Sequence, residues 1–189
     1  ICFSQDCNNS AMWGHYADSH KGFCLEYDLT SLISDCARNC EDIRQCVALM
    51  MSVAIAPVIY SKGRFDASSS FTSMLMNIVL ESATNKQVGY YYADMLLPIK
   101  ALLTKSDEWE YEAEWRMYRP LPSLDSLHQC IAKIKPTAVY RGIKMNIEDK
   151  KIIADIAKDK KIPCYQMVPQ YFSSTYEIKP IDVSLLDNQ

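Results

Sequence analysis

The segment SDEWEYEAEWRMYR, from Ser106 to Arg119, alternates charged and apolar side chains. Every second position from 108 to 116 carries a charge: Glu108, Glu110, Glu112, Glu114 and Arg116. On a β-strand these side chains share one face, opposite Trp109, Tyr111, Trp115 and Met117. A carboxylate row in a cleft has at least one raised pKa, because the acids repel one another, whereas a solvated row has no special chemistry.

The same segment also fits a helix, in which Glu112 pairs with Arg116 at the i,i+4 spacing. We expect a compromise, in which the chain is helical or irregular from Ser106 and becomes a strand by Glu112. Glu112, Glu114 and Arg116 then project from a single strand, and Trp115 points into the core.

The composition limits the classes of partner. The chain has 189 residues and a net charge of -3, and it contains no Lys/Arg run long enough to suggest a basic patch, so it carries no nucleic-acid-binding signature. Its longest apolar run, from Cys46 to Tyr60, is too short for a membrane span and contains Pro57. The sequence indicates neither a specific binding partner nor the oligomeric state.

Eight cysteines raise the question of disulfides or a metal site. No secretory signal precedes them and none forms a CxxC pair, and Cys36 and Cys40 lack a second pair of ligands. We therefore expect reduced thiols, no metal site and a cytoplasmic protein. The chain opens on Ile1 in a strand-like piece, which suggests a domain taken from a longer protein.

Hydrophobic periodicity and capping residues predict a mixture of helices and strands in one domain, residues 1–189. Helices are expected from Asn9 or Ser10 to about Ser19, from Ser31 onward, from Ser68 to Thr84, from Gln87 to Thr104, and from Asn146 to Lys158. Strands are expected at Ile1–Phe3, Phe23–Tyr27, Pro57–Tyr60, Thr137–Lys144, Pro163–Val168 and Thr175–Val183. The order is not a regular βαβ alternation, which indicates an α+β fold: a mixed, mostly antiparallel sheet with helices packed on it.

Several motifs together resemble a bacterial family called domain of unknown function 2971 (DUF2971). They are ICFS at the start, MWGHYADSHKGFCLEYD from Met12 to Asp28, the VIY strand, K-x(3)-W-x-x-E-x-E-W-R from Lys105, and AVYRGI from Ala138. The resemblance implies that N-terminal elements of the family domain precede Ile1 and are missing here. It also implies an origin in mobile or defence-related loci, including phage defence, and leaves the activity open.

One hypothesis drawn from this resemblance is a distant relationship to ADP-ribosyltransferases, with NAD as substrate and a role as a toxin or defence effector. Those enzymes hold the ribose with a strand-borne Glu, so Glu112 and Glu114 would be catalytic together with His15 as a base or clamp. Tyr16 and Trp13 would stack on a flat ring, and Arg116 would complete the substrate site. The helix carrying His15 must then pack over the strand carrying Glu114.

Two other hypotheses belong to different classes. In a non-catalytic regulatory or interaction module, Arg116 pairs with the glutamates, and His15 and Tyr16 join the same buried network. In a metal-dependent hydrolase, acids from separate elements would bind Mg²⁺, but only one acidic row is visible. An open cleft at Glu114 favours the enzyme, and a closed salt bridge favours the module.

Overall fold

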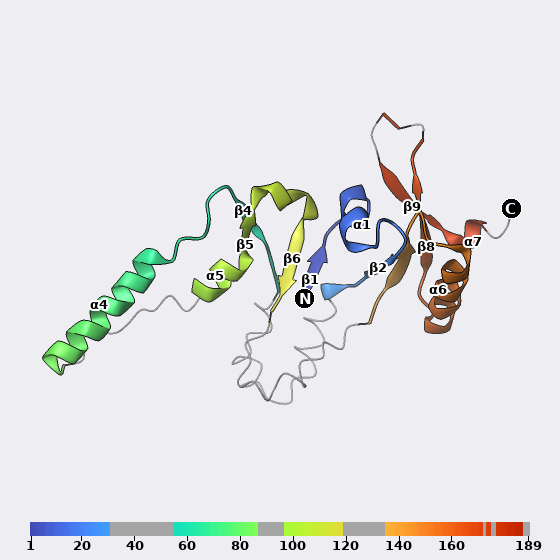
Figure 1. Ribbon diagram of the computed structural model, residues 1–189. Coiled ribbons are helices and arrows are strands. Elements are labelled where there is room, and N and C mark those ends of the chain that lie inside the picture. The colour runs from blue at the N-terminus through green and yellow to red at the C-terminus, as the bar shows by residue number, and fades with distance from the viewer. Residues whose placement is uncertain (31–54, 87–96, 119–134, 172, 175–176, 187–189) are drawn as a thin grey trace.

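The computed structural model describes residues 1–30, 55–86, 97–118, 135–171, 173–174 and 177–186 (Figure 1). The strands are β1 (Cys2–Ser4), β2 (Phe23–Glu26), β3 (Ile55–Pro57), β4 (Ile59–Ser61), β5 (Thr104–Ser106), β6 (Glu114–Met117), β7 (Ala138–Arg141), β8 (Cys164–Pro169) and β9 (Ile178–Asp182). The helices are α1 (Ser10–Tyr16), α4 (Ser68–Thr84), α5 (Leu97–Leu103), the 3-10 helix η2 (Asp107–Glu112), α6 (Ile147–Lys160) and α7 (Val183–Leu186). This mixture confirms the predicted α+β class.

The described strands form three small sheets. β6 is the central strand of an antiparallel sheet with the order β1-β6-β3, and β4 pairs with β5 in parallel. The largest sheet has the order β2-β7-β8-β9, in which only the β7–β8 pair is parallel. Antiparallel pairs therefore predominate, as predicted.

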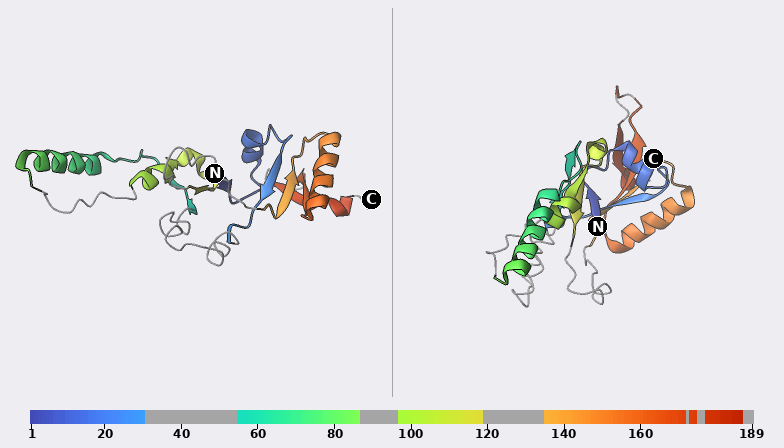
Figure 2. Two further views of the ribbon diagram at one scale, coloured as in Figure 1. Left: turned by 90° about the horizontal axis from the view of Figure 1, so that it is seen from below. Right: turned by 60° about the vertical axis from the view of Figure 1, so that its left-hand side comes forward.

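Helices cover both faces of the β2-β7-β8-β9 sheet, with α1 on one side and α6 on the other (Figure 2). Neighbouring strand residues point to opposite faces. Tyr140 accordingly joins Trp13 of α1 in the core, whereas Arg141 donates a hydrogen bond to the carbonyl of Lys150 in α6 (3.1 Å). The core cluster between α1 and the sheet consists of Trp13, Ala17, Ala138, Tyr140, Met167 and Ile178.

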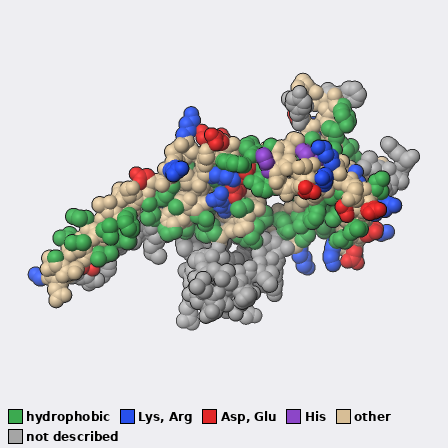
Figure 3. Space-filling model, in the orientation of Figure 1, with side chains coloured by type: hydrophobic (Ala, Val, Ile, Leu, Met, Phe, Trp, Pro, Cys, Tyr) green, Lys and Arg blue, Asp and Glu red, His purple; other side chains and the backbone are tan. Residues whose placement is uncertain are grey.

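α4 projects away from the sheets (Figures 1 and 2), and none of its residues is buried by the described part of the chain. Apolar side chains cover much of its visible surface (Figure 3). None of the described helices combines the length and the apolar character that a membrane span requires.

The element boundaries differ from the predicted ones where the backbone turns sharply. α1 ends at Tyr16 instead of continuing to Ser19, because Asp18, Ser19 and His20 have φ values of 45°, 53° and 71°. These left-handed values are incompatible with a right-handed helix.

The strand predicted at Pro57–Tyr60 is divided between two sheets. Val58 separates β3 from β4, and its N–H donates to the Glu114 carbonyl (2.9 Å). Asn146 caps α6, as predicted, by accepting a hydrogen bond from the Asp149 N–H (2.8 Å). The helix expected from Ser31 lies outside the described residues, and so do residues 87–96 of the helix expected from Gln87 to Thr104.

Candidate functional site

The acidic row divides into an exposed part and a buried part. Glu108 and Glu110 are exposed, whereas Glu112 is only 3% and Glu114 only 6% exposed. The alternative interpretation, in which the charged row simply faces solvent, is therefore wrong for Glu112 and Glu114. A buried carboxylate must be neutralised or paired, so the partners of Glu112 and Glu114 decide what this site can do.

The two buried glutamates come from different elements. η2 ends at Glu112, Ala113 adopts a left-handed conformation (φ 43°), and β6 begins at Glu114. The expected change from helix to strand is confirmed. The prediction that Glu112 projects from the same strand as Glu114 and Arg116 is wrong, because the 3-10 helix continues through Glu112.

Lys105, in β5, joins both carboxylates. Its Nζ donates to Oε2 of Glu114 at 3.0 Å and also to Oε2 of Glu112. Burial opposes the positive charge of Lys105, but the hydrogen bonds to the two glutamates prevail and raise its pKa. The ammonium group also lies 5.1 Å from the centre of the Trp109 ring, a cation–π contact.

Arg116 closes the other side of Glu114. Its Nε donates to Oε1 at 2.8 Å and its terminal Nη2 to Oε2 at 3.1 Å, which is the bidentate geometry of a strong ion pair. The guanidinium also donates to the carbonyl of Leu102. The hydrogen bonds from Arg116 are the main reason why the pKa of Glu114 falls from 4.5 to about 2. Glu114 is thus a fixed negative charge at neutral pH, and neither of its oxygens is free.

Tyr16 is the contact between α1 and this network. Its hydroxyl donates to Oε1 of Glu112 at 2.8 Å, and this hydrogen bond raises the pKa of the phenol. The side chain of Asn9 supports the same junction, since it caps α1 through the Ala11 N–H (2.9 Å) and donates to the Tyr111 carbonyl (2.6 Å). Hydroxyl groups also bind the backbone of the network: Tyr60 accepts from the Glu114 N–H (2.8 Å), and Ser4 donates to the Glu112 carbonyl (2.7 Å).

His15 lies among aromatic rings and makes no ion pair within the described residues. Its ring centre is 6.3 Å from Trp109 and 6.4 Å from Tyr111, which are themselves 5.9 Å apart. We call His15, Tyr16, Trp109 and Tyr111 the aromatic surface, because all four side chains are exposed. The structure therefore brings α1 to the acidic segment, with Tyr16 touching a carboxylate and His15 packed beside the rings of η2.

Trp13 has a different environment from its neighbours in α1. It is 3% exposed in the core cluster, and its Nε1 donates to the Cys7 carbonyl at 2.7 Å. Trp115, which we expected to point into the core, is half-buried and does not belong to the core cluster around Trp13. Only Tyr16, of the two aromatic residues suggested for stacking, presents its ring to solvent.

The charges of the network balance. Two carboxylates, Glu112 and Glu114, face two cations, Lys105 and Arg116. We define these four residues as the ion network. In the part of the chain that the structure describes, no group of three or more His, Cys, Asp or Glu side chains is arranged to hold a metal ion.

Comparison with known proteins adds the family. A family model described as "Protein of unknown function (DUF2971)" matches residues 12–117. The chain belongs to this family. No curated protein and no solved structure matches it. The DUF2971 match covers Tyr16, the aromatic surface and the whole ion network, and it provides no support for a relationship to ADP-ribosyltransferases.

Sequence reasoning missed Lys105 as a member of the ion network. The sequence could have indicated a second cation, because two buried carboxylates require two positive charges and the charged row contains only Arg116. Lys105 is the nearest preceding cation in the sequence. Cys2, Cys7 and Cys24 are free thiols, and Cys36, Cys40, Cys46 and Cys130 lie outside the described residues.

Proposed function

We propose that this DUF2971 domain is a non-catalytic interaction module in which the ion network holds the aromatic surface in a fixed shape. The observation that carries the proposal is the closure of Glu114. Arg116 and Lys105 occupy both of its oxygens, and the side chain is 7% exposed.

An ADP-ribosyltransferase-like enzyme would need this carboxylate to face the ribose of NAD. Glu114 would first have to leave Arg116, and breaking one partner out of a buried ion pair costs roughly 3–5 kcal/mol. The same geometry suits a structural role without any rearrangement. Glu112 contacts the exposed Tyr16, but Lys105 neutralises it in the same way.

The ion network connects the elements that carry the aromatic surface. Tyr16 comes from α1, Lys105 from β5 and Glu112 from η2, so one cluster joins α1 to the neighbouring β5 and η2 segments; Tyr16 and Glu112 are 96 positions apart in the sequence. Trp109 and Tyr111 are 38% and 37% exposed, and Tyr16 is 64% exposed. Exposed aromatic side chains held on a rigid support are typical of the central part of protein interfaces.

The test compares Glu114→Gln with Glu110→Gln, which makes the same change at an exposed position of the same segment. The purified chain is incubated with NAD, and nicotinamide release is measured. We expect no release above buffer for the wild type or for either variant. Release that disappears only in Glu114→Gln, with the folded state intact, would contradict the proposal and support the enzyme.

Hydrogen–deuterium exchange tests the structural half of the proposal. In Glu114→Gln we expect faster amide exchange in η2 and β6, because Lys105 and Arg116 lose the carboxylate that they share. Glu110→Gln should exchange like the wild type. Unchanged exchange in Glu114→Gln would show that the ion network does not hold the aromatic surface.

A further inference from the structure

A concave region lies on α1 and the larger sheet, separate from the ion network. It is an open pocket of about 640 Å³, within the range of small-molecule sites. Its lining includes Ser10, His20, Ile143, Lys144, Pro169 and Ile178. None of these residues belongs to the ion network or to the aromatic surface.

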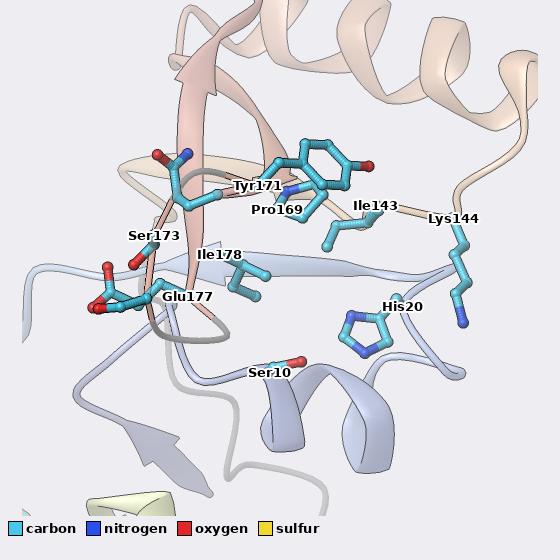
Figure 4. Close-up of a pocket in the computed structure, with 11 residues that line it drawn as sticks. Ser10, His20, Ile143, Lys144, Pro169, Tyr171, Ser173, Glu177 and Ile178 are labelled. Atoms are coloured by element: carbon cyan, nitrogen blue, oxygen red, sulfur yellow. The ribbon is translucent and has the colours of Figure 1, made fainter.

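The lining has two chemically distinct parts (Figure 4). His20 and Lys144 lie beside each other at one end, with the Ser10 hydroxyl near the imidazole. Ile143, Pro169 and Ile178 form an apolar wall, and Ile178 is only 4% exposed. Glu177 lies at the end opposite Lys144, with its carboxylate 3.5 Å from the Lys179 ammonium group. The pocket therefore offers a positive end and an apolar middle.

His20 has an unused polar atom. Its Nδ1 is buried and has no hydrogen-bond partner within the described residues. Burial lowers the pKa of His20, and the nearby Lys144 lowers it further, so the imidazole is neutral at neutral pH. A neutral imidazole with its proton on Nδ1 can donate one hydrogen bond there. Lys144 then supplies the positive charge at this end.

The backbone holds His20 in an unusual position. It is the last of three consecutive left-handed residues, and its carbonyl accepts from the Lys144 N–H at 2.9 Å. Next to it, the Gly142 N–H donates to the Gly22 carbonyl at 2.9 Å. Consecutive left-handed residues of this kind are strained, and such strain clusters at ligand sites.

We propose that this pocket binds a small organic monoanion, a carboxylate attached to an apolar body. The carboxylate lies at the end of the pocket that His20 and Lys144 form, and the apolar body packs against Ile178. One positive charge favours a single negative charge on the ligand, and the Glu177 carboxylate at the far end disfavours a second. This site goes beyond the proposed interaction function and does not depend on it.

The test uses phenylpropionate as the probe and follows backbone amide resonances by NMR. Two control compounds separate the contributions of charge and apolar contact. Phenylpropanamide has the same apolar group without the negative charge, and inorganic phosphate has negative charge without an apolar group. We expect phenylpropionate to bind with a Kd on the order of millimolar, as its size implies, and to shift the resonances of residues 20, 144 and 178. The amide and phosphate should bind about tenfold more weakly or not at all.

Lys144→Gln should weaken phenylpropionate about tenfold, whereas Lys158→Gln, an equal charge change on α6, should have no effect. His20→Asn should also weaken the probe while keeping the fold, because asparagine tolerates the left-handed backbone at position 20. Equal binding of acid and amide, or equal effects of the two lysine variants, would overturn the proposal. Shifts outside the pocket, or no shift in the millimolar range, would also overturn it.

Discussion

Lys105 Nζ lies 3.0 Å from Oε2 of Glu114, although the two residues are on different strands in different sheets. The same ammonium group also binds Glu112, so one lysine bridges the end of η2 and the start of β6. Arg116 then completes the neutralisation of Glu114 from the other side. The carboxylates that the sequence presents as a repulsive row are thereby converted into an attractive cluster.

Glu114→Gln should lower the free energy of unfolding by roughly 3 kcal/mol, because it leaves Arg116 without a charged partner at a mostly buried site. Urea denaturation at neutral pH measures the change. Glu110→Gln, at an exposed position, should stay within about 0.5 kcal/mol of the wild type. Equal stabilities for the two variants would show that the network is energetically unimportant.

The contribution of Glu114 should also depend on pH in a defined window. Its carboxyl pKa is 4.5 in the ordinary state and about 2 in the folded protein, so the unfolded chain takes up the proton first as the pH falls. The stabilisation is complete above pH 4.5 and is lost between pH 4.5 and about 2. The stability difference between the wild type and Glu114→Gln should shrink across that window, and a difference that is constant down to pH 2 would contradict the assignment.

The fold class and most described elements follow from local patterns in the sequence. Asn9 and Asn146 mark helix starts correctly, and the change from helix to strand in the acidic segment is also found. These features depend on capping and periodicity, which neighbouring residues determine.

Features that depend on distant contacts were not predictable in the same way. Lys105 reaches the site because β5 pairs with β4, and His20 enters its pocket because the 142–144 segment holds its loop. The end of α1 at Tyr16 has the same origin, since the left-handed residues after it are held by long-range backbone hydrogen bonds. Local propensity contains no information about such pairings.

A double-mutant cycle should detect coupling between Lys105 and Glu112. Lys105→Met, Glu112→Gln and the double variant are compared by urea denaturation. Because the two side chains share a mostly buried ion pair, we expect a coupling energy of about 1–3 kcal/mol. Lys62→Met, a matched change at an exposed lysine, should show no coupling with Glu112→Gln, and coupling there would indicate a non-specific charge effect.

The tryptophans of α1 and β6 should differ in their importance for stability. Trp13→Ala removes a side chain that is 3% exposed and should cost about 3–5 kcal/mol. Trp115→Ala removes a half-buried side chain and should cost roughly 2 kcal/mol. Thermal or urea unfolding of the two variants measures this order. A larger loss for Trp115→Ala would mean that β6 buries more of its apolar face than the structure shows.

Two glycine substitutions should have opposite signs, because the space around them differs. A Cβ on Gly142 would lie 2.1 Å from the His20 carbonyl oxygen and 2.7 Å from that of Gly22. Gly142→Ala must therefore separate two backbone segments that hydrogen bonds hold together, and it should cost about 3 kcal/mol. A Cβ on Gly14, inside α1, would have nothing within 4 Å, so Gly14→Ala should stabilise the helix by about 0.5–1 kcal/mol.

The shift in melting temperature of each variant shows whether the substitution stabilises or destabilises the protein. NMR resonances of residues 18–22 then show whether Gly142→Ala displaces the loop. A destabilised Gly142→Ala protein with an unchanged loop would place the strain elsewhere, whereas a neutral substitution would show that the His20 carbonyl can move away from position 142. In that second case the backbone contact does not fix the imidazole in its pocket, and the position of His20 must depend on its side chain alone.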